Sequence, residues 1–268
     1  MAKVVLITGG SSGIGKATAT MLSKKGFTVY GTSRNPDNAT PVGPFQLLQL
    51  DVSDETSVNN AVATVLEKEG KIDVLVNNAG IGITGAIEET PHEELHKAFT
   101  TNLYGPIHVM KAVLPHMRKQ HYGLIINITS IAGYMGLPYR GIYSATKGAL
   151  ELITEAMRME VRDFGIHITN VAPGDFATNI ASGRYHTPVY EDSPYKTTYS
   201  NILHTINDDV NSGDDPVKVA RLIHKIIQTK RPRIHYKAGA FMQKFSIVLK
   251  RLLPDKVFEK LLANHYKL

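Results

Sequence analysis

The chain has 268 residues and a mass of 29.4 kDa, a size that suits one large α/β domain. Its 43% hydrophobic and 20% charged residues exclude wholesale disorder, and the absence of cysteine excludes disulfides, cysteine nucleophiles and thiolate metal sites. No secretory signal opens the chain, and no uncharged apolar stretch reaches the ~18 residues that a membrane span needs. We therefore expect a cytoplasmic protein.

Positive charge is concentrated in the C-terminal tail. The formal net charge is +6 and the calculated pI is 9.3. Residues 230–268 hold ten Lys and Arg side chains against two acidic ones, which leaves 20 basic and 22 acidic side chains in the first 229 residues. A basic segment can bind nucleic acid or anionic lipid, or only add solubility. No nucleic-acid-binding motif accompanies the charge, so we expect no nucleic-acid partner.

Short apolar runs alternate with longer segments of helical periodicity through the first 171 residues. Strands that alternate with helices need crossover connections, which produce a parallel sheet with helices on both faces. We predict a single doubly wound, Rossmann-type α/β domain with a seven-stranded parallel sheet. The predicted strands are 3–8, 27–32, 46–51, 72–77, 124–129 and 167–171, with a seventh near 233–236, and the predicted helices are 13–25, 58–69, 90–119 and 142–164.

The periodicity decays between residues 178 and 215, where only 199–206 has helical spacing. An irregular segment of this length in a compact domain is usually a functional lid. Beyond it, residues 237–268 are predicted to form a basic amphipathic extension that packs on the domain of residues 1–236. Its two apolar stripes, which Pro254 separates, are Phe241, Phe245, Val248, Leu249, Leu252 and Leu253, and then Val257, Phe258, Leu261 and Leu262.

A glycine-rich loop, Thr8-Gly9-Gly10-Ser11-Ser12-Gly13-Ile14-Gly15, links the first predicted strand to the first helix. Glycines let backbone N–H groups approach a pyrophosphate, and the helix N-terminus adds partial positive charge. A glycine loop in this strand–loop–helix context predicts nucleotide binding. Its spacing, T-G-x-x-x-G-x-G, resembles that of the short-chain dehydrogenase/reductase family.

The resemblance extends from about residue 3 to residue 236 and implies the strand order 3-2-1-4-5-6-7, with 178–215 as a substrate loop. Asn77-Asn78-Ala79-Gly80 is similar to the family's N-N-A-G, Asp51-Val52 to its D-V, and Pro173-Gly174 with Thr178 to the strip along the nicotinamide. The implied cofactor-binding residues are Gly9, Ser11, Ser12, Gly13, Ile14, Gly15, Arg34, Asp51, Val52, Asn78, Ala79, Gly80, Tyr143, Lys147, Pro173, Gly174 and Thr178.

Asn102, Ser130, Tyr143 and Lys147 match the family's catalytic tetrad. Residues four apart share a helix face, so the Lys147 ammonium can lie near the Tyr143 phenol, lower its pKa from ~10 and favour general acid/base catalysis. The resemblance implies that Tyr143 exchanges a proton with the substrate oxygen and that Ser130 hydrogen-bonds this oxygen. It also implies that Lys147 holds the nicotinamide ribose and that Asn102 positions a water.

The end of the second predicted strand bears on the choice of cofactor. Relatives that prefer NAD carry an acid there, whereas this chain has Gly31-Thr32-Ser33-Arg34, with a guanidinium suited to a 2′-phosphate. Ser11 and Ser12 can add hydroxyl contacts. We therefore expect NADP(H) as the cofactor, although Arg34 as a solvated surface residue stays open.

One motif suggests a metal site but is better explained otherwise. His92-Glu93-Glu94-Leu95-His96 matches the zinc-protease pattern H-E-x-x-H. Thr90-Pro91 directly before it is typical of a helix start, and two histidines without a third ligand make an incomplete zinc site. We predict no metal.

The resemblance implies reversible hydride transfer between NADP(H) and an apolar alcohol, ketone or aldehyde. Hydroxysteroid- and retinol-type reductases with C-terminal extensions look most similar in character. A 3-oxoacyl-carrier-protein reductase and a non-catalytic NADPH sensor or scaffold remain alternatives. The apolar side chains beside the matched positions are expected to line the substrate pocket, with at least one in the core instead; they are Ile83, Tyr134, Met135, Phe176 and Ile180.

Family members are commonly homodimers or homotetramers, built partly on the helix that carries Tyr143, and we expect the same here. The basic amphipathic tail can lie on an anionic membrane surface. Ordinary globular helices show the same pattern, so we favour the alternative that the tail covers the substrate cleft or a partner subunit.

Overall fold

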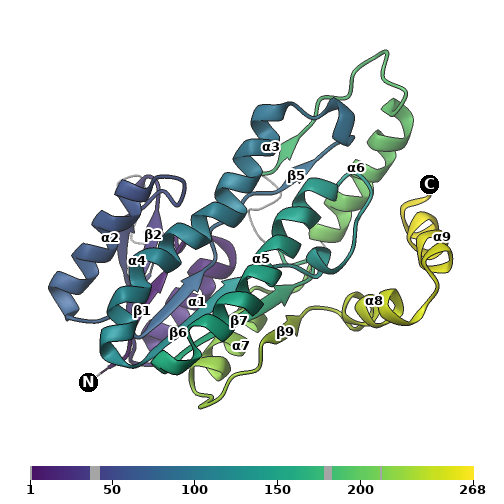
Figure 1. The fold of residues 1–268 in the computed structure, drawn as a ribbon. Helices are drawn as coiled ribbons and strands as arrows, with labels where there is room; N and C mark the ends of the chain where they lie inside the picture. Colours follow the sequence, from purple (N-terminus) through teal and green to yellow (C-terminus); the bar gives the residue numbers. More distant parts are fainter. Residues whose placement is uncertain (1, 37–42, 178–182, 212) are drawn as a thin grey trace.

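The structure is a computed structural model that describes residues 2–36, 43–177, 183–211 and 213–268. Its centre is a seven-stranded parallel sheet of order β3-β2-β1-β4-β6-β7-β9 (Figure 1). Counted along the chain within this sheet, the order is the expected 3-2-1-4-5-6-7. The strands are β1 (Val4–Ile7), β2 (Thr28–Ser33), β3 (Gln46–Gln49), β4 (Val74–Asn77), β6 (Gly123–Ile128), β7 (Ile166–Pro173) and β9 (His235–Ala238).

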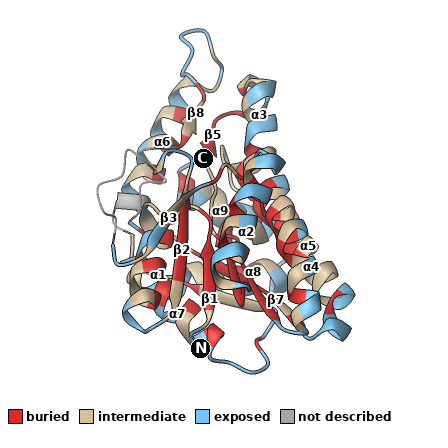
Figure 2. Cartoon of the chain, turned by 90° about the vertical axis from the view of Figure 1, so that its left-hand side faces the viewer, coloured by how far each residue is buried: buried red, intermediate tan, exposed pale blue. Residues whose placement is uncertain are grey.

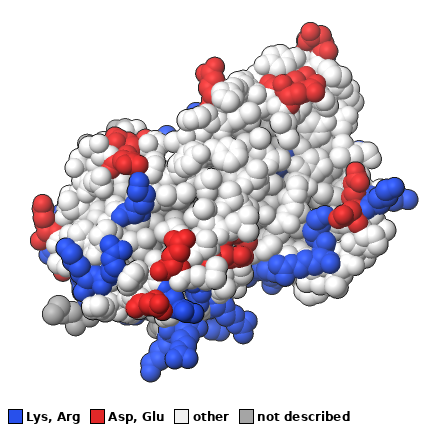
Figure 3. Space-filling view, in the orientation of Figure 1, with Lys and Arg blue, Asp and Glu red and all other residues white. Residues whose placement is uncertain are grey.

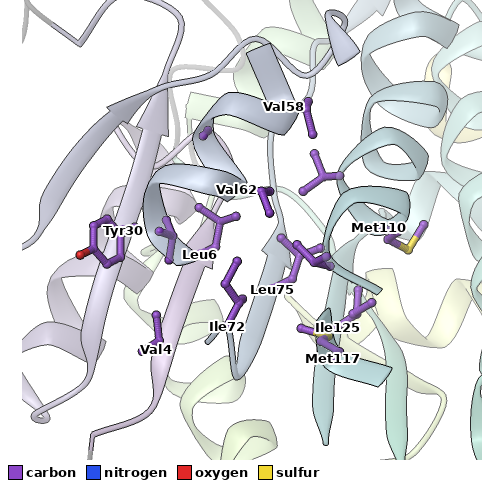
Figure 4. Close-up of a cluster of buried hydrophobic side chains, with 14 of the residues drawn as sticks. Val4, Leu6, Tyr30, Val58, Val62, Ile72, Leu75, Met110, Met117 and Ile125 are labelled. Atoms are coloured by element: carbon purple, nitrogen blue, oxygen red, sulfur yellow. The ribbon is translucent and has the colours of Figure 1, made fainter. Parts of the chain in front are cut away.

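Both faces of the sheet are covered by helices, because strand side chains alternate between the faces. In β1, Val4 and Leu6 belong to one buried cluster and Val5 and Ile7 to another. The first cluster, part of which Figure 4 shows, packs against α2 (Glu55–Glu69), α4 (Gly105–Gln120) and α5 (Gly141–Glu160). The second packs against α1 (Gly13–Lys24) and α7 (Val217–Ile227). The central strands β1, β4 and β6 are consequently buried along their whole length (Figure 2), whereas the edge strands β3 and β9 are largely half-buried or exposed.

The single helix predicted for residues 90–119 is interrupted. It consists of α3 (His92–Phe99), a π-helical turn (Thr100–Tyr104) and α4. A Cβ at Gly105 would lie 2.7 Å from Val52 Cγ2, so the glycine lets the start of α4 approach the chain after β3. Such π-turns often mark functional sites. This one contains Asn102, which is fully buried.

The part of the chain after β7 holds elements that the sequence pattern did not indicate. A two-residue strand β5 (Ile83–Thr84) pairs in parallel with β8 (Tyr185–His186). The expected helix 199–206 is longer, α6 (Lys196–Asn211). The helix α7 was not predicted, although Val219, Ile223 and Ile226 have helical spacing and are buried against the sheet.

The tail forms two helices, α8 (Phe241–Leu252) and α9 (Asp255–Tyr266), at the positions of the two apolar stripes. Ile247 and Phe258 are buried with Met135, whereas Phe241 and Leu252 are 71% and 75% exposed. Lys and Arg side chains gather along the lower edge of the molecule near the tail (Figure 3). Among the described residues, no helix is long and apolar enough to cross a membrane.

Candidate active site

A cleft of about 330 Å³ opens at the carboxyl ends of the central strands, the place where doubly wound sheets bind ligands. It brings together residues from the ends of β1, β2, β4, β6 and β7 and from the start of α5. Its lining includes Gly9, Ser12, Gly13, Ile14, Arg34, Asn78, Ala79, Gly80, Ile83, Ser130, Tyr143, Lys147, Pro173, Gly174 and Phe176. Most of the expected cofactor residues therefore share one cavity with three of the four expected catalytic residues.

The N-terminus of α1 borders this cleft and has free hydrogen-bonding capacity. Its N-cap, Ser12, makes no side-chain capping bond, and no acidic residue lies in the first turn. At the start of α2, by contrast, Asp54 accepts hydrogen bonds from the backbone N–H groups of Thr56 and Ser57. An uncapped helix N-terminus on a cavity favours a phosphate group, so the residues present fit the pyrophosphate of a dinucleotide.

Glycines allow the loop before α1 to fold tightly against β2 and β4. Gly9 and Gly13 have φ values of +67° and +51°. A Cβ at Gly15 would lie 2.1 Å from the Gly9 carbonyl oxygen, a distance that no side chain tolerates. Asn78 holds the same loop, because its Nδ2 donates to the carbonyl oxygens of Thr8 (2.9 Å) and Gly9 (3.1 Å). The shape of the cradle is therefore fixed by backbone contacts.

Several expected cofactor residues do not line the cleft. Ser11, Gly15, Asp51 and Val52 are outside its described lining. The Asp51 carboxylate accepts hydrogen bonds from the N–H (2.9 Å) and hydroxyl (2.6 Å) of Ser53. Thr178 and Ile180 lie outside the described residues.

Tyr143, Ser130 and Lys147 meet at the inner end of the cleft. Tyr143 and Lys147 are 9% and 4% exposed, and Lys147 Nζ lies 6.0 Å from the centroid of the Tyr143 ring. Lys147 Nζ donates to the carbonyl oxygen of Ile128 at 3.0 Å. Ser130 caps the turn after β6, where its hydroxyl accepts from Ala132 N–H at 3.1 Å. A phenol, a hydroxyl and an ammonium thus converge in one nearly water-free place.

The expected lowering of the Tyr143 pKa is wrong for the protein alone. Burial raises the pKa of Tyr143, and this outweighs the lowering by the Arg140 charge and by a hydrogen bond with Ser130. Lys147 Nζ, 6.0 Å from the centroid of the Tyr143 ring, is not among the groups that shift this pKa most. Burial lowers the pKa of Lys147 to about 8. Near neutral pH, Tyr143 is therefore a proton donor and Lys147 is still mainly charged.

Asn102 lies close to the cleft but is engaged with the backbone. Its Oδ1 accepts from Ile81 N–H (2.8 Å), and its Nδ2 donates to the Ile81 carbonyl oxygen (2.9 Å) and to Thr146 Oγ1 (3.2 Å). This amide clamps the segment that follows Asn78-Ala79-Gly80. The structure places no described catalytic side chain in a hydrogen bond with it.

The expected substrate residues divide into two groups. Ile83 and Phe176 line the cleft. Tyr134 and Met135 are outside the described lining and pack in a cluster with Ile247 and Phe258 from the two tail helices. The apolar surface after Ser130 is therefore used mainly to hold the tail.

The sequence analysis missed Gly82 and three charged residues that also line the cleft, Arg140, Asp175 and Arg184. The Arg140 guanidinium carbon lies 5.7 Å from the centroid of the Tyr143 ring. Arg140 is the N-cap of α5, and its position three residues before Tyr143 was a usable signal. Arg184 gave no such signal, because it lies in the irregular segment and reaches the cleft only through the pairing of β5 with β8.

Comparisons with known proteins agree with this geometry. The short chain dehydrogenase family profile matches residues 3–188. A 3-ketodihydrosphingosine reductase of Bacteroides thetaiotaomicron is 41% identical over 98% of both chains. A short-chain dehydrogenase structure from Streptomyces avermitilis has a TM-score of 0.85 at 32% identity and covers 97% of this chain and 96% of its own.

A short-chain dehydrogenase/reductase from Burkholderia phymatum, solved in complex with NAD, has a TM-score of 0.82 at 25% identity and covers 93% of each chain. None of these relatives is named a hydroxysteroid or retinol reductase, so the expected resemblance to those enzymes gains no support here. The chain belongs to the short-chain dehydrogenase/reductase family and is an oxidoreductase that acts on CH–OH groups with a nicotinamide cofactor, NAD(H) or NADP(H).

Proposed function

We propose that this protein reduces a long-chain ketone to the secondary alcohol with NADPH, and that 3-ketodihydrosphingosine represents its substrate class. The observation that carries the proposal is a buried, protonated Tyr143 beside Ser130 and Lys147 in the cleft. The name of the relative that is 41% identical over nearly the whole chain supports the substrate class.

Tyr143 and Ser130 are placed to serve the oxygen of a ketone that is being reduced. A nicotinamide cofactor bound in the cleft would supply a hydride to the carbonyl carbon. As this C–H bond forms, the π electrons of the C=O bond move to the oxygen, and Tyr143 donates its proton there. The Ser130 hydroxyl donates a hydrogen bond to the same oxygen. A protonated phenol can act as the acid in this step, whereas alcohol oxidation needs the phenolate.

Lys147 supplies a buried positive charge at the moment when Tyr143 becomes a phenolate. Because its pKa is about 8, most of it is an ammonium near neutral pH. A cation near the ring favours the anionic product of the proton transfer. Its hydrogen bond to the Ile128 carbonyl holds this charge at the end of β6.

Arg34 supports NADP(H) over NAD(H). It lines the cleft just after β2, with no acidic residue in the preceding Gly31-Thr32-Ser33. A guanidinium can bind a 2′-phosphate with two hydrogen bonds, and a carboxylate in its place would repel the phosphate. The cofactor lies, in this proposal, between Arg34 and Tyr143.

The substrate's apolar part is proposed to contact Ile83 and Phe176, which line the cleft. A homodimer or homotetramer is part of the proposal as well. It is supported by Leu152 and Met159 on α5, which are 67% and 71% exposed and give that helix an apolar outer surface.

The direct test is NADPH oxidation by the purified full chain with 3-ketodihydrosphingosine, a 3-oxoacyl thioester, a steroid ketone and retinal. We expect turnover with 3-ketodihydrosphingosine, and its loss in Tyr143→Phe. Turnover only with the 3-oxoacyl thioester would replace the proposed substrate class by the carrier-protein alternative. No turnover with any ketone, although NADPH binds, would favour the sensor or scaffold.

A further inference from the structure

Arg184 is a buried arginine in the wall of the catalytic cleft, and part of its guanidinium has no partner. The residue is 8% exposed and lines the cleft. Its Nη1 is buried and lacks a hydrogen-bond partner among the residues that the structure describes. Buried guanidinium groups are almost always paired, because an unpaired buried donor is costly. An unpaired nitrogen at a cavity wall therefore indicates a group that arrives with a ligand.

The fold makes a dedicated place for this side chain. Tyr185 N–H donates to the Gly82 carbonyl oxygen at 3.0 Å, next to the β5–β8 pairing, and this fixes the backbone beside Arg184. A Cβ at Gly82 would lie 2.9 Å from Arg184 Cγ and 3.2 Å from its Nε. Gly82 does not have a left-handed φ. Glycine is therefore needed at position 82 because the Arg184 side chain occupies the space of a Cβ, and not because of the backbone conformation there.

The charges around Arg184 define the ligand group that suits it. Four cationic side chains line the cleft in its described part, Arg34, Arg140, Lys147 and Arg184, against a single carboxylate, Asp175. The Asp175 carboxylate already accepts a hydrogen bond from Gln243 Nε2 at 2.6 Å. Such a field attracts an anion or a strong hydrogen-bond acceptor, and it leaves Asp175 as the one carboxylate of the described lining that a substrate ammonium can face.

Arg184 is also close to the reacting position. It lines the same cleft as Tyr143, Arg140 and Asp175, and burial together with the charge of Arg140 lowers the pKa of its guanidinium. The group that it binds must therefore lie near the carbonyl that Tyr143 protonates, not at the far end of a long alkyl chain.

We propose that Arg184 is a specificity-determining residue, which hydrogen-bonds an acceptor group that the substrate carries beside its reacting ketone. The inference rests on the proposed ketone reduction and narrows its substrate class. Suitable substrates are 3-oxo acids, their esters and β-hydroxy ketones, whereas plain alkyl ketones lack the group. In 3-ketodihydrosphingosine, the 1-hydroxyl is the acceptor for Arg184.

The first test compares methyl 3-oxodecanoate with 3-decanone, which differ in the ester group. The ester is intrinsically more reactive, so the informative quantity is the change in the ratio of their kcat/KM values on mutation. We expect Arg184→Gln to lower the ratio of kcat/KM for the ester to that for 3-decanone about tenfold or more, the effect of one charge-assisted hydrogen bond. Gly82→Ala, which displaces the arginine but keeps its charge, is expected to act in the same direction.

Arg221→Gln is the matched control, because Arg221 is an exposed arginine on α7. We expect it to leave the ratio unchanged. The inference is overturned if both variants reduce methyl 3-oxodecanoate and 3-decanone with the same ratio of kcat/KM values as the unchanged protein. Arg184 would then not select the substrate. The proposed ketone reduction would stand in that case.

A second measurement does not depend on turnover. Decanoate is titrated by calorimetry into the full chain saturated with NADP⁺, which keeps the anion away from the phosphate cradle. We expect Arg184→Gln to weaken decanoate binding about tenfold or more and Arg221→Gln to have no effect. If Arg184→Gln and Arg221→Gln bind decanoate with equal affinity, the inference is overturned. Failure of all ketones to react would overturn the proposed function, while this titration would still decide the role of Arg184.

Discussion

The two sides of the catalytic cleft are built in different ways. The cofactor side consists of the loop before α1, the end of β4 and the start of α5, and its shape depends on close backbone contacts such as that of Gly15 with Gly9. The substrate side consists of Asp175, Phe176 and Arg184, which are held by side-chain contacts between distant parts of the chain. The first kind of construction gives a constant site for one cofactor, and the second allows the substrate to differ between relatives.

The largest expected effect is on the residue shared by the two sides. Tyr143→Phe keeps the ring and removes the proton donor, so we expect kcat to fall about 10²- to 10⁴-fold. The dissociation constant of NADPH, measured by fluorescence titration, should stay within about threefold, because the cradle before α1 is untouched. A variant that keeps near-normal turnover would show that Tyr143 is not the acid.

Lys147→Met separates catalysis from stability. Burial lowers the pKa of Lys147 from 10.5 to about 8. The unfolded chain therefore binds more protons than the folded one between these values, and stability of the unchanged protein rises with pH in this interval. The cost of burying the Lys147 ammonium applies in full below pH ~8. Near neutral pH, the free energy of unfolding of the inactive Met variant should therefore exceed that of the unchanged protein by up to about 3 kcal/mol.

Urea unfolding of both proteins at several pH values measures this difference. We expect the difference in unfolding free energy between Lys147→Met and the unchanged protein to decrease as the pH rises from about 8 towards 10.5. A variant that is less stable than the unchanged protein near pH ~7 would mean that Lys147 contributes more through the Ile128 hydrogen bond than its burial costs.

Gly15→Ala tests the close packing on the cofactor side. The added Cβ would lie 2.1 Å from the Gly9 carbonyl oxygen, so the loop must shift. We expect a loss of about 1–3 kcal/mol in unfolding free energy, together with weaker NADPH binding. The control is Gly136→Ala, because that glycine has an ordinary φ and no atom within 4 Å of the Cβ position. Equal melting temperatures of the two variants would contradict the packing argument.

Arg34→Asp tests cofactor choice. It removes the proposed partner of the 2′-phosphate and adds a repelling charge, so we expect NADPH to bind about tenfold or more weaker, with NADH little changed or improved. Calorimetric titration of both cofactors into both proteins gives the comparison. An equal loss for NADPH and NADH would show that Arg34 does not read the 2′-phosphate.

The smallest effect is expected where the tail supports the substrate side. Gln243 on α8 donates from Nε2 to Asp175 at 2.6 Å, and its Oε1 accepts from Asp175 N–H at 3.4 Å. Gln243→Ala should raise KM for the ketone about two- to fivefold, since both hydrogen bonds to Asp175 are lost, and leave NADPH affinity unchanged. A larger effect on NADPH than on the ketone would show that the tail supports the cofactor side instead.

The same contrast explains what the sequence could predict. The parallel sheet, the glycine loop and the positions of Ser130, Tyr143 and Lys147 follow from local patterns, namely apolar periodicity, glycine spacing and helix-face geometry. The π-turn at Asn102 gave no pattern of its own, because its residues also fit a continuous helix.

Other features depend on distant contacts. The raised pKa of Tyr143 could not be predicted because burial causes it, and the spacing of Tyr143 and Lys147 does not reveal how deeply the phenol is buried. The positions of Arg184 and Asp175 depend on β5–β8 pairing and on Gln243, which lie about a hundred and about seventy residues away in the sequence. Tyr134 and Met135 were expected in the pocket because they follow Ser130, but the tail helices cover them.

The most direct test of the central claim is isotope transfer in the cleft. The full chain is incubated with NADPH that carries deuterium at both C4 positions of the dihydronicotinamide and with 3-ketodihydrosphingosine, and the product is analysed by mass spectrometry. Hydride transfer with Tyr143 as the acid predicts one deuterium on the carbinol carbon of the alcohol, and formation of this product about 10²- to 10⁴-fold more slowly by Tyr143→Phe. An alcohol without deuterium, or labelled product formed by Tyr143→Phe at the rate of the unchanged protein, would contradict it.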